Sequence, residues 1–75
     1  MGPMPDMYPA DEGRPFASGP IQHTVWRSGS KNDIPLFAVR KDGKAAFDVV
    51  TEAEAAEKYG EGIRAAIALL PGSPR

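Results

Sequence analysis

The sequence predicts a small α+β domain, in which one C-terminal helix packs across a three-stranded antiparallel sheet. Three observations lead to this prediction: period-two alternation of apolar residues, an Asp-Gly pair between two apolar runs, and a later apolar stripe at three-and-four spacing. The chain has 75 residues and contains no cysteine. A chain of this length buries only about 60% of its unfolded surface, so it holds one core at most. We expect a single domain over residues 21–71, between tails at 1–20 and 72–75.

The first 20 residues predict a disordered, Pro-rich tail. Proline lacks a backbone donor and has a fixed φ, so it interrupts helices and strand ladders. The tail is locally acidic, and its large apolar anchors are Tyr8 and Phe16. Either this segment stays solvated, or it orders on a partner. Five prolines lie in it: Pro3, Pro5, Pro9, Pro15 and Pro20.

Three strands are expected between the tail and the helix. Alternation of apolar and polar residues predicts the first strand over 21–27. Turn-forming residues at 28–33 separate it from a second strand over 34–41. The Asp-Gly pair that follows favours a tight hairpin turn, so the third strand is expected at 44–50.

A helix is expected after the third strand. Thr51 and Glu54 have the spacing of a capping box, in which each side chain satisfies a free backbone donor at a helix start. The apolar stripe predicts a helix from Glu52 to about Leu70. Glycine costs about 1 kcal/mol in a helix interior, so a break into two helices near Gly60 is the alternative.

No catalytic, metal or cofactor site is expected. The one histidine, His23, lies in a predicted strand without cysteine, and metal sites and nucleophilic triads need several such groups together. We expect His23 to be a structural or surface residue. No apolar run is long enough for a membrane span. The prediction is therefore a non-enzymatic, cytoplasmic monomer without cofactors.

Charge is distributed unevenly along the chain. Nine Lys and Arg residues against ten Asp and Glu give a net charge of −1, whereas nucleic-acid-binding domains usually have a basic excess. Residues 21–50 nevertheless hold five basic and three acidic residues, so the sheet face away from the helix is expected to be mildly basic. These charges either protect exposed strand edges or form a binding face.

Five residues are candidates for contacting a partner. Exposed Trp and Arg are frequent hot spots of protein interfaces. Trp26 is interpreted either as a core residue beneath the helix or as an exposed anchor, and Phe37 and Phe47 are expected to pair across the hairpin in the core. The candidates are Trp26, Arg27, Lys31, Arg40 and Lys44.

The stretch from Gly43 to about Ala66 resembles the DNA-binding domain of plant ethylene-response factors. The likeness lies in a strand that ends near Phe47 and in the helix start Thr-Glu-Ala-Glu-Ala-Ala at 51–56, with Tyr59 soon after. In that family the helix follows the third strand of a three-stranded sheet, and the sheet enters the DNA major groove. The resemblance implies DNA contacts at three of the candidates: Arg27, Arg40 and Lys44.

The whole chain is also similar in type to small phage or mobile-element proteins that bind and inhibit a host machine, such as RNA polymerase or a defence nuclease. This likeness rests on short length, absence of cysteine, near-neutral charge and a small α+β body. We therefore expect a protein-binding inhibitor or regulator of a host protein in transcription or defence. Sequence-specific DNA binding through the sheet face is the alternative.

Overall fold

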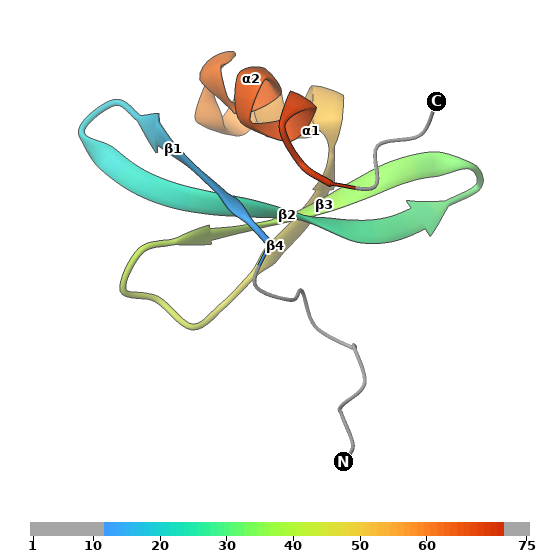
Figure 1. Cartoon of the computed structure of the whole chain (residues 1–75), viewed down its shortest axis with the longest axis horizontal. Coiled ribbons are helices and arrows are strands. Elements are labelled where there is room, and N and C mark those ends of the chain that lie inside the picture. Colours follow the sequence, from blue (N-terminus) through green and yellow to red (C-terminus); the bar gives the residue numbers. More distant parts are fainter. Residues whose placement is uncertain (1–11, 72–75) are drawn as a thin grey trace.

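The computed structural model describes residues 12–71 of the chain. One antiparallel sheet has the strand order β1-β2-β3-β4, and two helices follow it (Figure 1). The α+β class and the antiparallel sheet are confirmed, but the prediction of three strands and one helix is wrong in both numbers. The elements are β1 (Arg14–Ser18), β2 (Ile21–Lys31), β3 (Ile34–Lys41), β4 (Asp48–Thr51), α1 (Glu52–Tyr59) and α2 (Gly62–Ala68).

The additional strand, β1, lies inside the segment for which disorder was predicted. Its residues pair antiparallel with β2, from Arg14 opposite Val25 to Ser18 opposite Ile21. Phe16 at its centre is only 7% exposed and belongs to the core. Proline argued against a strand here, but β1 is an edge strand, where a missing donor is tolerated. The part of the predicted tail at 1–11 lies outside the described residues.

The hairpin between β2 and β3 has a shorter loop than the six residues predicted. Strand β2 continues to Lys31, and only Asn32 and Asp33 form the turn, with φ of 53° and 66°. Two positive φ values are typical of a type I′ turn, whose twist matches its strands. A bulge between Arg27 and Ser30 shifts the register by one residue before this turn.

The Asp-Gly turn forms, but the strand after it begins later than predicted. The Lys44 backbone N–H donates to the carbonyl of Lys41 at 2.9 Å. Asp42, however, donates its own N–H to the carbonyl of Gln22 at 3.0 Å and thus remains in the ladder with β2. Its φ is not positive, as a type I′ turn requires, so the chain leaves the sheet and returns only at Asp48.

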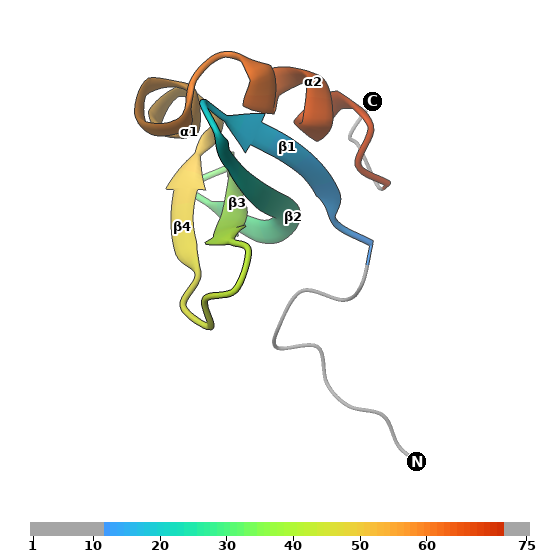
Figure 2. The same cartoon turned by 90° about the vertical axis from the view of Figure 1, so that its left-hand side faces the viewer.

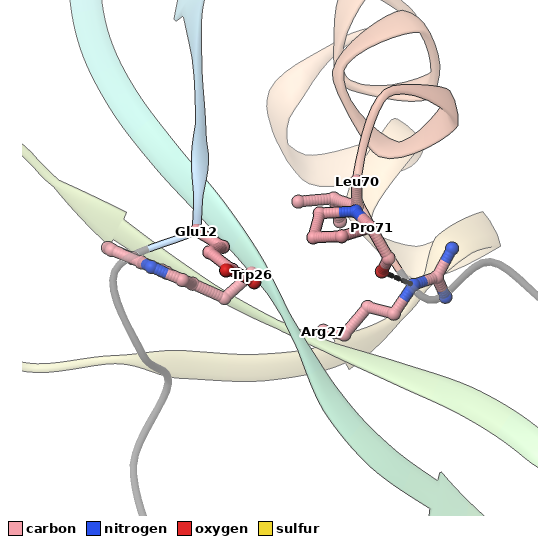
Figure 3. A pocket seen from close by; sticks show the side chains of 5 residues that line it. All are labelled: Glu12, Trp26, Arg27, Leu70 and Pro71. Atoms are coloured by element: carbon pink, nitrogen blue, oxygen red, sulfur yellow. Dashed lines mark hydrogen bonds between the residues drawn. The ribbon is translucent and has the colours of Figure 1, made fainter.

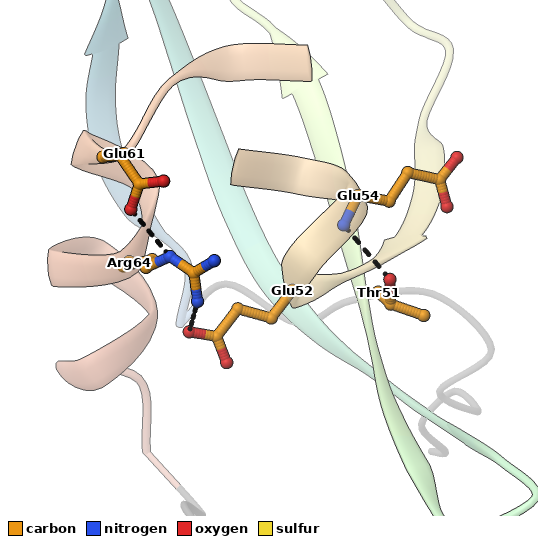
Figure 4. A network of polar contacts seen from close by, with 5 residues as sticks. All are labelled: Thr51, Glu52, Glu54, Glu61 and Arg64. Carbon is orange, nitrogen blue, oxygen red and sulfur yellow. Dashed lines mark hydrogen bonds and ion pairs between the residues drawn. The ribbon is translucent and has the colours of Figure 1, made fainter. Parts of the chain in front are cut away.

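Thr51 starts α1 as predicted, because its Oγ1 accepts a hydrogen bond from the Glu54 backbone N–H at 3.2 Å (Figure 4). The helix ends at Tyr59, and Gly60 has a φ of 97° that a helix cannot contain. The predicted alternative of two helices is therefore confirmed, and one continuous helix is wrong. The Arg64 guanidinium then connects them, since it donates to Glu61 at 2.8 Å and to Glu52 at 3.1 Å.

Both helices lie across the same face of the sheet, with the core between them (Figure 2). Val25 and Ile63 are fully buried, and burial of such a side chain contributes about 1.5–3 kcal/mol. No helix of residues 12–71 covers the remaining face of the sheet, and we call it the open face. The core residues are Phe16, Val25, Phe37, Val39, Val50, Ala55, Ala56, Ile63, Ala66, Ile67 and Leu70.

Candidate binding surface

Strand register determines which side chains lie on the open face. Residues directly opposite each other in a ladder project to the same side of a sheet. Trp26 lies opposite Ala38, Ala38 lies opposite Val49, and Arg40 lies opposite Thr24. The neighbouring positions along these strands are core residues beneath the helices. Trp26, Arg40 and Val49 therefore share the open face.

Two aromatic rings and one guanidinium group meet on this face. The Trp26 and Phe47 rings are 5.3 Å apart between centroids and meet edge to face at 75°. The Arg40 guanidinium carbon lies 5.3 Å from the Trp26 ring centroid and 5.7 Å from that of Phe47. Edge-to-face rings and cation–π contacts each stabilise such an arrangement by about 0.5–1 kcal/mol. We call these three residues the Trp26 cluster.

The open face is apolar and partly accessible around this cluster. Phe47 is 40% exposed and Val49 is 52% exposed, whereas Ala38 between the strands is only 1% exposed. Because no helix covers Ala38, the side chains of this face itself must shield it. The open face thus carries a small packed layer with apolar surface left in contact with solvent.

The backbone before β1 passes over the indole of Trp26. A Cβ atom added at Gly13 would lie 2.5 Å from the Nε1 of Trp26, a distance that no real Cβ contact shows. The indole Nε1 is accordingly buried, and it has no hydrogen-bond partner among residues 12–71. Glycine at position 13 therefore allows the chain to approach Trp26 closely.

A small surface pocket of about 130 Å³ lies beside Trp26 at the edge of β2 (Figure 3). Arg27 borders it, and its Nε donates a hydrogen bond to the carbonyl of Pro71 at 3.0 Å. The guanidinium carbon of Arg27 also lies 5.5 Å from the Phe37 ring centroid in the core. Arg27 therefore connects the end of α2 to the sheet on the side of the helices. The lining residues are Glu12, Trp26, Arg27, Leu70 and Pro71.

The five sequence candidates do not form one site. Only Trp26 and Arg40 contact each other, within the Trp26 cluster. Arg27 lies on the opposite face, Lys31 is exposed at the end of β2, and Lys44 is exposed in the loop between β3 and β4. The interpretation of Trp26 as a core residue beneath the helix is wrong, because its position in β2 turns it to the open face.

Two residues of the surface, Phe47 and Val49, were not among the candidates. Phe47 was expected to pair with Phe37, but Phe37 lies opposite Val50 in the core, and Phe47 packs on Trp26 instead. Exposure of one valine could have been predicted from the sequence. Val49 and Val50 are adjacent in a strand, and adjacent strand residues point to opposite faces, so only one of them can lie in the core beneath the helices.

The titratable groups near the core lie on the side of the helices. Asp48 accepts hydrogen bonds from Tyr59 Oη at 2.6 Å and from Lys58 Nζ at 2.7 Å. His23 is 7% exposed, and its ring stacks 5.2 Å from Phe16 and lies 5.1 Å from Tyr59. His23 is therefore part of the packed interior of the domain.

The pKa values of Asp48 and Tyr59 are both shifted from their ordinary values. The bonds from Lys58 and Tyr59 hold the pKa of Asp48 below its ordinary value of 3.8. Burial, together with the hydrogen bond to Asp48, raises the pKa of Tyr59 to about 12. The lowered pKa keeps Asp48 ionised at neutral pH, so that it forms the ion pair with Lys58 that joins β4 to α1.

Residues 12–71 contain neither a metal-ligand cluster nor a membrane-spanning helix. No three His, Cys, Asp or Glu side chains in that range come together as ligands for a metal ion. No helix in it is both long and apolar enough to cross a membrane.

Comparison with known proteins gives no relative from which a function could be transferred. No protein-family model, curated protein or solved structure matches this chain.

Proposed function

We propose that this chain is a non-enzymatic protein-binding module that recognises its partner through the open face. The observation that carries the proposal is the Trp26 cluster, in which an arginine lies over two aromatic rings beside the exposed Val49. Trp and Arg are the residue types most often found as hot spots, and they act from a packed cluster with apolar surroundings. The open face has this composition and geometry.

The positions of the basic residues favour a protein over DNA as the partner. DNA binding depends on several Lys and Arg residues that neutralise neighbouring phosphates. Of the three DNA contacts implied by the ethylene-response-factor resemblance, Arg27 lies on the opposite face, where it holds Pro71. A host protein of the transcription or defence machinery stays our prediction for the partner's identity, in line with the likeness to small phage inhibitors.

Capture from bacterial lysate by the tagged full chain tests this proposal, when it is compared with two matched variants. Val49→Glu places a charge on the open face, at a residue 52% exposed. Leu69→Glu makes the same kind of change at a residue 63% exposed, at the end of α2. We expect the unmodified chain and Leu69→Glu to capture the same proteins in similar amounts. Val49→Glu should capture about ten times less of them, as expected when a charge is buried at a hot spot.

Two results would contradict the proposal. Equal retention of every captured protein by both variants would exclude the open face as the binding surface. Loss of all capture after nuclease treatment would favour the DNA-binding alternative. Circular dichroism of both variants provides the control that each one is folded.

A further inference from the structure

We propose that the open face selects an acidic segment of its partner, in which a carboxylate binds Arg40 and a neighbouring apolar side chain packs on Phe47 and Val49. This inference rests on the proposed function, because it specifies the chemistry of the ligand at the same surface. Three properties of the open face support this inference: Arg40 has no ion-pair partner among residues 12–71, basic residues outnumber acidic ones, and apolar side chains are exposed.

Arg40 is a fixed cation without an anion. Two of the other basic residues, Lys58 and Arg64, form ion pairs with carboxylates among residues 12–71, but Arg40 forms none there. Its Nε is buried without a hydrogen-bond partner, while the residue as a whole is only half-buried. Contacts with Trp26 and Phe47 hold the guanidinium group in place. Such a group is preorganised to bind a carboxylate through two parallel hydrogen bonds.

Two basic residues and one acidic residue of the described sheet and its turns lie on the open face. The acidic residue is Asp42, which follows β3 in the ladder with β2 and accepts a hydrogen bond from Thr24 Oγ1 at 3.5 Å. Arg40 is one of the two basic residues, near the end of the inner strand β3. The other is Lys31, because the bulge in β2 places it opposite Ile34, whose side chain alternates onto the open face. The acidic strand residue, Asp48, lies opposite the core residue Val39 on the other face, where Lys58 binds it. Basic residues therefore outnumber acidic ones on the open face by two to one, which favours a negatively charged ligand.

Exposed apolar side chains lie beside this charge. Phe47, which contacts Arg40, and Val49, on the adjacent strand, are 40% and 52% exposed. A ligand of phosphates alone would leave both in water, whereas an extended peptide places an apolar side chain close to a carboxylate at alternate positions. This combination favours an acidic peptide segment over nucleic acid.

Selection from a display library of random short peptides on the folded full chain tests the inference. We expect the peptides enriched on the unmodified chain to contain Asp or Glu two positions away from an apolar residue. The enrichment of acidic residues should disappear on Arg40→Gln. It should persist on Lys41→Gln, which makes the same charge change at the adjacent residue, opposite His23 on the helix side.

Fluorescence of Trp26, the single tryptophan of the chain, then measures binding of one selected peptide at the cluster itself. Replacement of its acidic residue by glutamine should weaken binding to the unmodified chain about tenfold or more, since a charge-assisted hydrogen bond is lost. This arm varies only the ligand, so it remains decisive even if Arg40→Gln fails to fold.

Three results would overturn the inference: neutral or basic peptides among those enriched, no enrichment at all, or equal binding of the glutamine peptide. Nucleic-acid binding would replace the inference if duplex DNA, but not acidic peptides, changed the Trp26 emission and if this change disappeared in Arg40→Gln. If Val49→Glu still abolishes protein capture after any of the first three results, the proposed function stands and only the carboxylate specificity is wrong.

Discussion

The ionisation of Asp48 and Tyr59 makes the stability of this domain dependent on pH at both extremes. The folded-state pKa of Asp48 is lowered, so its contribution is fully present above 3.8 and is lost as the pH falls through the folded value. The folded-state pKa of Tyr59 is raised from 10.0 to about 12, so its contribution is present below pH 10.0 and is lost as the pH rises toward 12.

We predict that the free energy of unfolding of Tyr59→Phe falls less steeply with pH than that of the unmodified chain between pH 10.0 and about 12. Urea unfolding at several pH values measures this difference, and other alkaline groups cancel because both proteins contain them. Parallel curves for the two proteins would show that Tyr59 titrates alike in the folded and unfolded states.

His23 is buried between aromatic rings without full hydrogen bonding. Its Nδ1 has no partner, and a buried polar atom without one costs about 1–3 kcal/mol. We predict that His23→Phe leaves the free energy of unfolding unchanged or raises it by about 1 kcal/mol, because the new ring can stack on Phe16 and Tyr59. A clear decrease in the free energy of unfolding, measured with urea, would show that the imidazole makes a stabilising polar contact.

At the scale of elements, the turn between β2 and β3 contains an avoidable conformational cost. Asp33 has a φ of 66°, which is unfavourable for a residue with a Cβ atom. Asn-Gly is the preferred pair of a type I′ turn, so Asp33→Gly should raise the free energy of unfolding by about 0.5 kcal/mol. Asp33→Ala should lower it by a similar amount. The same sign for both variants in thermal or urea unfolding would contradict this explanation.

The start of α1 depends on one side chain. Removal of the Thr51 hydroxyl leaves the Glu54 backbone donor without its acceptor, so Thr51→Ala should lower the free energy of unfolding by about 1 kcal/mol. Thr51→Ser retains the hydroxyl and should restore most of the loss. An unchanged melting temperature in Thr51→Ala would show that the Thr51 hydroxyl does not stabilise the start of α1.

The sequence patterns predicted the elements whose signals are local. Three such signals agree with the structure. They are the Thr51 hydroxyl as the cap of α1, the alternation over 21–27, and the glycine break at Gly60, which was predicted only as the alternative to one helix. β1 was missed because its pairing with β2 is a tertiary effect that proline obscures. The Trp26 cluster was predicted only in part, since it depends on a register that brings Phe47 from a loop onto the sheet.

At the scale of the whole molecule, both helices pack on one face of the sheet, so the open face is shielded from solvent mainly by its own side chains. Ala38 is buried there by the residues around it, so the domain has a second, thin layer of apolar contacts. This layer could not be read from periodicity, because an alternating strand predicts only which residues share a face. It is also the layer that the proposed function uses.

The two ends of the described chain lie together. Glu12 and Pro71 line the same pocket, and Arg14 donates a hydrogen bond to the carbonyl of Leu69 at 3.3 Å (Figure 3). A unit whose ends adjoin can be inserted into a loop of another protein or circularly permuted without stretching either connection. We predict that a permutant with these ends joined by a short linker, and opened at the exposed Gly60, keeps the circular dichroism spectrum and cooperative unfolding of the original chain.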